Sequence, residues 1–154
     1  MLLYLVQHAE AKREEEDPAR DLTEKGREDI TKVARFVGNL PVAISRILHS
    51  GKTRALTTAA ILAASLQPPQ GLSATDGLAP LDDPGIWADR LANLEEELVL
   101  VGHLPHLARL AARLTCGDPE TSPINFHMGA MVCLQRLEPG RWAVEWMLTP
   151  ALLG

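Results

Sequence analysis

The sequence predicts an α/β fold, a three-layer α/β/α sandwich with a mostly parallel central sheet and a C-terminal hairpin. Two observations support this prediction. Short apolar runs with the length of strands alternate with segments of helical periodicity through most of the chain. Near the C-terminus, two further strand-like runs are separated only by a short turn containing Gly140. With 154 residues and no break in composition, the chain is expected to form a single domain over residues 1–154.

The first predicted strand covers Leu2–Val6, and the first predicted helix begins after Thr23. The strand is a continuous apolar run, which is typical of a parallel strand buried on both faces. A polar stretch with charges of both signs and one proline follows, and indicates an exposed loop. Thr23 is a suitable N-cap, and the segment behind it should end at Gly38-Asn39. Four residues at helical spacing form its apolar face: Ile30, Val33, Ala34 and Val37.

The middle of the chain predicts a second strand, a helix and a short third strand. Residues 44–50 alternate between apolar and polar side chains and include β-branched residues, so we expect a strand less buried than the first. A helix is expected over residues 53–66. The loop that follows is rich in proline and glycine, and a short strand is expected within it at residues 72–74.

The remaining elements complete the predicted order of β-α-β-α-β-α-β-α-β-β. A helix begins at Pro84 and is expected to run to residue 94. The apolar run at 97–103 predicts a strand, the segment 105–114 a helix, and the runs 131–137 and 142–148 an antiparallel hairpin. In the helix that begins at Pro84, three residues are expected to face inward: Ile86, Leu91 and Leu94.

Composition restricts the functions that the chain can have. A net charge of −5 argues against a broad nucleic-acid surface, because such a surface needs clustered lysine and arginine. The two cysteines, Cys116 and Cys133, lack the spacing of a metal site and are expected to be unpaired thiols. No apolar run has the length of a membrane span, and the N-terminal residues do not resemble a signal peptide. We therefore expect a cytoplasmic protein without a membrane partner.

Polar residues follow three of the predicted strands, at the point where each strand ends. They are Gln7-His8, Ser50 with Arg54 shortly beyond it, and Gly102-His103. Because ligands in α/β sheets bind outside the carboxyl ends of the strands, two imidazoles and a guanidinium are predicted to share one pocket. Arginine and helix N-termini bind phosphate, and a neutral histidine can attack phosphorus. The sequence therefore predicts a site for phosphoryl chemistry.

Four motifs in this order resemble those of the histidine phosphatase superfamily, also called phosphoglycerate-mutase-like. They are "LYLVQHAEA", "LTEKG", "ILHSGKTRALTTA" and "VLVGHLPHL". The resemblance covers nearly the whole chain, and the short length is most similar to the SixA-type branch of phosphohistidine phosphatases. It implies the phosphoglycerate-mutase-like α/β fold, a covalent phosphohistidine intermediate, no cofactor and no metal.

The resemblance also implies a role for individual residues. His8 matches the phospho-accepting nucleophile, His103 the second histidine beside the phosphoryl group, and Arg54 the phosphate-binding arginine. Arg20 matches an arginine often found at the mouth of the pocket. Gln7 stands where the family has arginine, and it can contribute a neutral amide to phosphate binding. Since charge-assisted hydrogen bonds are stronger than neutral ones, this difference is expected to cost about 1–2 kcal/mol of phosphate stabilisation.

Several alternatives remain open from the sequence. His49 and His127 can line the rim of the pocket or serve only packing and surface roles, and the spacing of His103 and His106 also permits a metal site. Asp82 and Asp83 are the only candidates for a general acid. The expected substrate is phosphohistidine on a signalling protein such as a phosphotransfer domain. The alternatives are a small phosphomonoester, or phosphate binding without turnover because Gln7 replaces the arginine.

Overall fold

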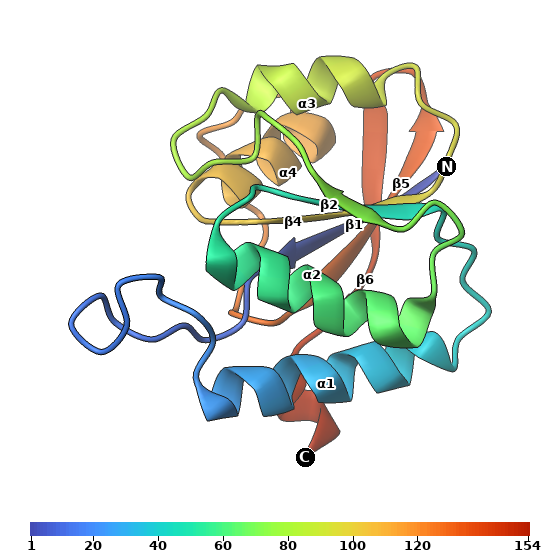
Figure 1. Ribbon diagram of the computed structural model, residues 1–154. Coiled ribbons are helices and arrows are strands. Elements are labelled where there is room, and N and C mark those ends of the chain that lie inside the picture. The colour runs from blue at the N-terminus through green and yellow to red at the C-terminus, as the bar shows by residue number, and fades with distance from the viewer.

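The computed structural model describes residues 1–154 and contains one six-stranded sheet in the order β3-β2-β4-β1-β5-β6 (Figure 1). The strands are β1 (Leu2–Gln7), β2 (Arg46–His49), β3 (Leu72–Ala74), β4 (Leu98–Gly102), β5 (Met131–Glu138) and β6 (Arg141–Leu148). The first four of these strands pair in parallel, and β5 runs antiparallel to both β1 and β6. The predicted α/β fold with a mostly parallel sheet and a C-terminal hairpin is confirmed.

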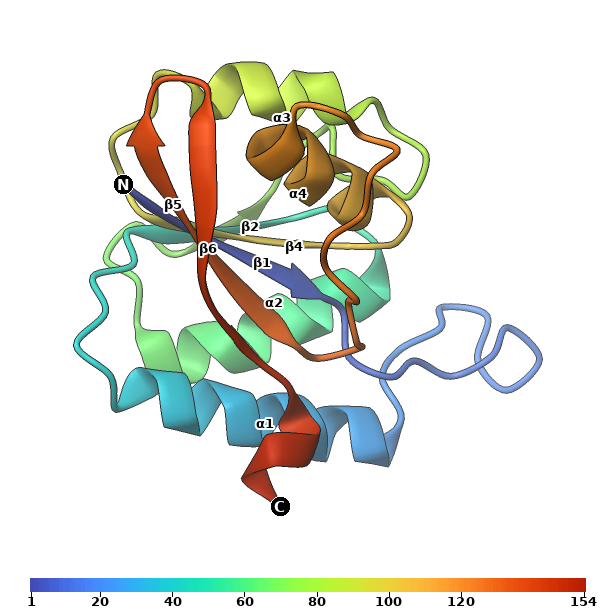
Figure 2. The ribbon, with the colours of Figure 1, turned by 180° about the vertical axis from the view of Figure 1, so that it is seen from behind.

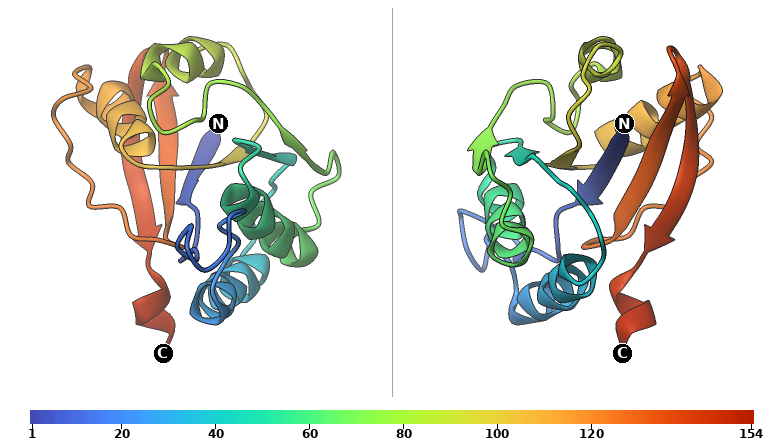
Figure 3. Two further views of the ribbon diagram at one scale, coloured as in Figure 1. Left: turned by 60° about the vertical axis from the view of Figure 1, so that its left-hand side comes forward. Right: turned by 90° about the vertical axis from the view of Figure 1, so that its right-hand side faces the viewer.

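Helices cover both faces of the sheet (Figures 2 and 3). The helices are α1 (Glu24–Gly38), α2 (Thr53–Leu66), α3 (Pro84–Leu91), α4 (His106–Cys116) and a final 3₁₀ turn, η1 (Pro150–Leu153). Along β1, Tyr4 and Val6 belong to the core beneath α1 and α2, whereas Leu3 and Leu5 belong to the core beneath α3 and α4. Both faces of β1 are therefore buried, which explains its continuous apolar sequence.

Helix α1 is tied directly to the segment that follows β1. The Thr23 side chain accepts a hydrogen bond of 3.0 Å from the Gly26 backbone N–H, which confirms the predicted N-cap. A Cβ atom on Gly26 would lie 2.2 Å from the backbone oxygen of Glu10, so only glycine fits at this position. This close approach fixes the start of α1 against the chain just beyond His8.

The structure corrects two details of the predicted elements. In β2, Ile47, Leu48 and His49 are all buried, because this strand lies between β3 and β4 and has core on both faces. Helix α3 ends at Leu91 rather than at residue 94. Ile86 is 37% exposed, since the inward face of this short helix is formed by Trp87 and Leu91.

The structure also describes the two cysteines, the character of the helices and a final turn. Cys116 and Cys133 are free thiols, the first exposed and the second buried in β5. None of the helices combines the length and the apolar character needed to cross a membrane. The turn η1 was not predicted, because four residues after a strand give no periodic pattern to detect.

Candidate active site

The carboxyl ends of β1, β2 and β4 meet at one edge of the sheet. The backbone N–H of His8 donates to the Gly102 carbonyl over 3.0 Å, which joins the end of β1 to the end of β4. The Ser50 hydroxyl lies 2.7 Å from Nε2 of His103, which joins the segment after β2 to the segment after β4. The predicted convergence of the three strand ends is therefore present in the structure.

Hydrogen bonding determines which ring nitrogen of His8 is free. Its Nδ1 atom lies 2.7 Å from the backbone oxygen of Ala9. A carbonyl oxygen only accepts hydrogen bonds, so Nδ1 carries the proton and Nε2 keeps its lone pair. Burial lowers the pKa of His8, the hydrogen bond to Ala9 opposes this effect, and the charges of Arg54 and Arg20 lower the pKa further. His8 is thus held as a neutral imidazole whose Nε2 lone pair is available.

His103 lies beside His8, with 5.1 Å between the ring centroids and 51° between the ring planes. Burial lowers the pKa of His103 to about 3, with further contributions from the charges of His8 and Arg54. His103 is therefore neutral at pH 7. A doubly negative phosphoryl group placed between the rings would raise this pKa and favour a second N–H donor on His103.

Three basic residues surround the two imidazoles. Arg54 lies in the first turn of α2, and its Nε atom is buried without a hydrogen-bond partner. Burial lowers the pKa of Arg54, and the charge of Arg20 lowers it further. The charges of Lys52 and Arg54 also act on the pKa of His103. The site is thus locally positive in a protein of net charge −5, as binding of an anion requires.

Arg20 is positioned by the loop that projects between β1 and α1 (Figure 1). The loop is closed at its base by the bridge between Ala11 and Leu22. Arg20 has a φ of +53°, an unusual conformation for a residue with a side chain, and its Nε donates to the Lys12 carbonyl over 3.2 Å. This geometry holds the guanidinium close enough to influence both His8 and Arg54.

Gln7 is the last residue of β1 and lies opposite Gly102 in the register. Its backbone oxygen accepts a hydrogen bond of 3.0 Å from Gly129, whereas its side-chain Oε1 is buried and has no partner. The strand alternation places Gln7 on the same face as Leu5, beneath α3 and α4. The Oε1 atom of Gln7 therefore forms no hydrogen bond that contributes to the fold.

A family model described as "Histidine phosphatase superfamily (branch 1)" matches residues 3–82, a segment that contains both His8 and Arg54. The chain belongs to the histidine phosphatase superfamily. No curated protein sequence is significantly similar to it.

Solved structures are similar to the chain over nearly its whole length. The protein histidine phosphatase SixA, solved as a complex with tungstate, is 25% identical, with 100% of both chains covered and a TM-score of 0.89. A candidate phosphohistidine phosphatase SixA from Agrobacterium tumefaciens is 20% identical, with 97% of each chain covered and a TM-score of 0.77. The alpha-ribazole phosphatase from Shigella flexneri, 14% identical over 97% of each chain, has a TM-score of 0.78. The similarity to the Agrobacterium tumefaciens and Shigella flexneri proteins shows only that they share the fold of this chain.

Two hydroxyl residues of this candidate site have contacts that sequence reasoning missed. Thr58, fully buried in α2, accepts a hydrogen bond of 3.0 Å from the Ala9 N–H and donates to the Arg54 carbonyl over 2.8 Å. Ser50 contacts His103 as described above. Both residues lie in the motif "HSGKTRALTTA", but the motif alone does not show which groups each hydroxyl contacts.

The remaining histidines do not contact His8 through a hydrogen bond. Nδ1 of His49 accepts a hydrogen bond of 3.1 Å from the Gly51 N–H, and His127 lies 3.4 Å from the Asn125 amide. His106 is fully buried in α4, and both of its ring nitrogens lack partners. No three histidine, cysteine, aspartate or glutamate side chains lie close enough together to hold a metal ion.

Proposed function

We propose that the chain acts as a single-domain phosphatase in which His8 accepts the phosphoryl group and passes it to water. The observation that carries the proposal is the state of His8: Nδ1 is bound to the Ala9 carbonyl, Nε2 is free, and the His103 ring lies 5.1 Å away. Arg54, His103 and the Gln7 amide are assigned to binding the phosphoryl oxygens, with Arg20 at the rim. No metal or other cofactor takes part in the proposed reaction.

The reaction proceeds in two displacements. Nε2 of His8 attacks phosphorus while the bond from phosphorus to the substrate nitrogen breaks, and the substrate imidazole, protonated on its other ring nitrogen, leaves as a neutral ring. Water then attacks phosphorus, the bond to Nε2 breaks, and inorganic phosphate leaves, while the second proton of the water passes to the phosphate or to the solvent. Because Nδ1 of His8 keeps its proton on the Ala9 carbonyl, the phosphorylated ring is cationic and leaves as a neutral imidazole. Arg54 and His103 stabilise the charge on the phosphoryl oxygens in both steps.

Phosphohistidine on a signalling protein, such as a phosphotransfer domain, is the proposed substrate. A phosphoramidate leaves with less help from a general acid than an alkoxide does, and the two candidate acids already have structural roles. Asp82 accepts a hydrogen bond from the Ala79 N–H, and Asp83 caps α3 through the Gly85 N–H. The similarity to SixA supports the same substrate class. A reducing, cytoplasmic location is proposed on the basis of the free thiols.

Two other functions rest on specific observations. A phosphatase of small phosphomonoesters is favoured by the fold shared with the alpha-ribazole phosphatase. A protein that binds a phosphorylated partner without turnover is favoured by Gln7, which has no charge to offer a transferring phosphoryl group.

One experiment distinguishes the three functions. The purified protein is incubated with a phosphorylated phosphotransfer domain and, separately, with a panel of phosphomonoesters, and kcat/KM is measured for each. The proposal expects the phosphotransfer domain to have the highest kcat/KM and radioactive phosphate to be trapped on the protein after rapid quenching. A higher kcat/KM for any monoester contradicts the proposed substrate. Saturable binding without turnover or trapped label contradicts the proposed activity.

A further inference from the structure

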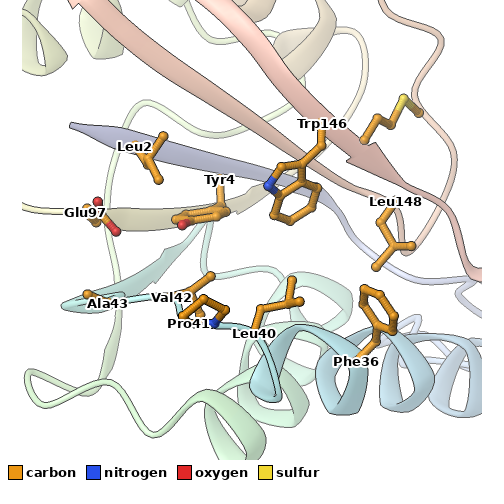
Figure 4. A pocket seen from close by; sticks show the side chains of 11 residues that line it. Leu2, Tyr4, Phe36, Leu40, Pro41, Val42, Ala43, Glu97, Trp146 and Leu148 are labelled. Atoms are coloured by element: carbon orange, nitrogen blue, oxygen red, sulfur yellow. The ribbon is translucent and has the colours of Figure 1, made fainter.

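A cavity of about 550 Å³ lies on the face of the sheet that α1 and α2 cover (Figure 4). Eleven residues line it, and nine of them are hydrophobic. None belongs to the candidate active site. The cavity extends from Glu97, just before β4, along Tyr4 in β1 to Trp146 in β6, and the chain from Phe36 to Ala43 forms its other wall. Its volume is within the range of pockets that bind small molecules.

One end of the cavity is polar. Tyr4 has no exposed surface, and its hydroxyl is buried without a hydrogen-bond partner. In Figure 4 the hydroxyl is directed toward the side of the cavity on which the Glu97 carboxylate lies. Burial raises the pKa of Tyr4, and the charge of Glu97 adds to this effect. A buried hydroxyl without a partner costs free energy, so this end of the cavity is suited to a ligand that supplies the missing hydrogen bond.

The Glu97 carboxylate differs from those of the two glutamates that precede it in the sequence. Glu95 forms an ion pair with Arg136, and Glu96 forms one with Arg46. Glu97 takes part in none of the ion pairs or side-chain hydrogen bonds of the protein. It is also the only charged residue among the eleven that line the cavity. The cavity thus has one negative charge and no positive charge.

Aromatic and aliphatic side chains form the rest of the wall. The ring of Trp146 lies 6.0 Å from that of Tyr4, and Phe36 is 46% exposed although it borders an apolar cavity. Leu40 and Val42 lie across the cavity from Tyr4 in Figure 4. An apolar ligand body placed here would bury Phe36 and pack on the ring of Trp146.

We propose that this cavity binds a small amphipathic cation, with an ammonium group at the Glu97 end and an aromatic or aliphatic body between Trp146 and Phe36. The ammonium group donates one hydrogen bond to the Glu97 carboxylate and, once the side chains that cover Tyr4 move aside, another to the Tyr4 hydroxyl, which has no exposed surface in the free protein. An anionic ligand is excluded because Glu97 would repel it and no lining residue would compensate. A neutral ligand of the same shape gains the apolar contacts but not the ion pair.

Three probes of equal length test the charge preference: 4-phenylbutylammonium, 4-phenylbutanol and 4-phenylbutyrate. Isothermal titration calorimetry measures the affinity of each for the full chain. We expect the ammonium to bind at least tenfold more tightly than the alcohol, and the carboxylate to bind most weakly. In Glu97→Gln the ammonium and the alcohol should bind with similar affinity. Phosphatase activity should be unchanged in this variant, because Glu97 lies outside the candidate active site.

A second variant separates binding from folding. Tyr4→Phe removes a hydroxyl that has no partner in the free protein, so the melting temperature without ligand should not fall. The increase in melting temperature caused by 4-phenylbutylammonium should be smaller than in the unsubstituted chain. A melting temperature that falls without ligand would show that the hydroxyl already has a partner, and would overturn its assignment to the ligand.

Three results would overturn the proposal as a whole. One is equal affinity for the ammonium and the alcohol, or an ammonium affinity that Glu97→Gln does not change. Another is competition by inorganic phosphate, which would place the probe at the active site. The third is sedimentation showing a dimer that 4-phenylbutylammonium dissociates, because a second copy of the chain would then be the natural occupant of this face.

Discussion

The ring of His8 lies 5.1 Å from the ring of His103, and both imidazoles are buried and neutral in the free protein. Two neutral imidazoles at this distance do not repel one another, whereas two imidazolium ions would. A phosphoryl group between them changes this balance, because its negative charge stabilises protons on the surrounding groups. The pair is therefore suited to one ring attacking phosphorus while the other becomes a hydrogen-bond donor.

Replacing His8 by alanine should abolish phosphatase turnover together with acid-labile labelling of the protein, because only this residue presents a free Nε2 fixed by a bond to the Ala9 carbonyl. Circular dichroism should show an unchanged fold, since His8 follows β1 rather than forming part of it. His127→Ala, which replaces an exposed histidine, serves as the control and should keep both properties. Turnover by His8→Ala at a rate near that of the unsubstituted chain would refute the covalent role.

Acid should destabilise the protein through its buried histidines. Burial holds the pKa values of His8, His49, His103 and His106 below 6.5 in the folded state, with that of His103 at about 3. Below pH 6.5 the unfolded chain binds protons that the folded chain does not, so the free energy of unfolding falls as the pH falls. Each histidine contributes a slope of at most about 1.4 kcal/mol per pH unit.

Urea denaturation between pH 7.5 and 4.5 measures this slope. His103→Gln removes the histidine whose pKa burial lowers to about 3, and its slope should be shallower than that of the unsubstituted chain over the whole interval. Identical slopes for the two proteins would mean that His103 titrates normally in the folded state.

The Thr58 hydroxyl should position both His8 and Arg54. Thr58→Val keeps the shape of the side chain but leaves the buried Ala9 N–H without a partner, which should cost about 1–3 kcal/mol of stability. We expect kcat/KM to fall as well, because the same hydroxyl binds the Arg54 carbonyl. Thr58→Ser retains the hydroxyl and should restore most of the activity. If Thr58→Ser were as inactive as Thr58→Val, the hydrogen bonds would not be the cause.

Replacing Gln7 by arginine should raise kcat/KM for a phosphohistidine substrate by about tenfold, if a charge-assisted hydrogen bond adds about 1–2 kcal/mol. The Gln7 Oε1 has no partner in the fold, so little folding energy is lost with it. Gln7→Leu, which removes the amide without adding charge, is the control and should lower kcat/KM.

The competing expectation is that Lys52 or Arg20 already supplies this charge, since Arg20 acts on the pKa values of His8 and Arg54, and Lys52 acts on that of His103. In that case Gln7→Arg would leave kcat/KM unchanged or reduce it, and Arg20→Ala would reduce activity much more in the natural chain than in Gln7→Arg. Measuring all four combinations of the two positions distinguishes the two expectations.

Elements that depend on local sequence patterns were predicted well. The apolar run before Gln7, the N-cap at Thr23 and the periodic helices each depend on local physics, and their positions are confirmed within a few residues. The convergence of His8 and His103 also followed, because parallel strands bring their carboxyl ends to one edge.

Contacts that depend on three-dimensional packing could not be predicted. The burial of β2 depends on its place between β3 and β4, and the bond from Ala9 to Thr58 joins residues 49 positions apart. The inward face of α3 was placed one residue too early, at Ile86 rather than at Trp87, because eight residues give only two turns of periodicity. No sequence pattern indicates the cavity beside Tyr4, since its walls come from separate parts of the chain.

The sheet order has a consequence for synthesis on the ribosome. Strand β1 is made first, yet both of its neighbours, β4 and β5, are encoded in the last third or so of the chain. At a translation rate of about 5–20 residues per second, the first strand emerges several seconds before any segment that can pair with it. During that interval "LLYLV" is an exposed apolar strand with no native partner. Chaperones that recognise short hydrophobic segments therefore have a window in which this nascent chain is their substrate, and it closes only when the C-terminal hairpin has left the exit tunnel.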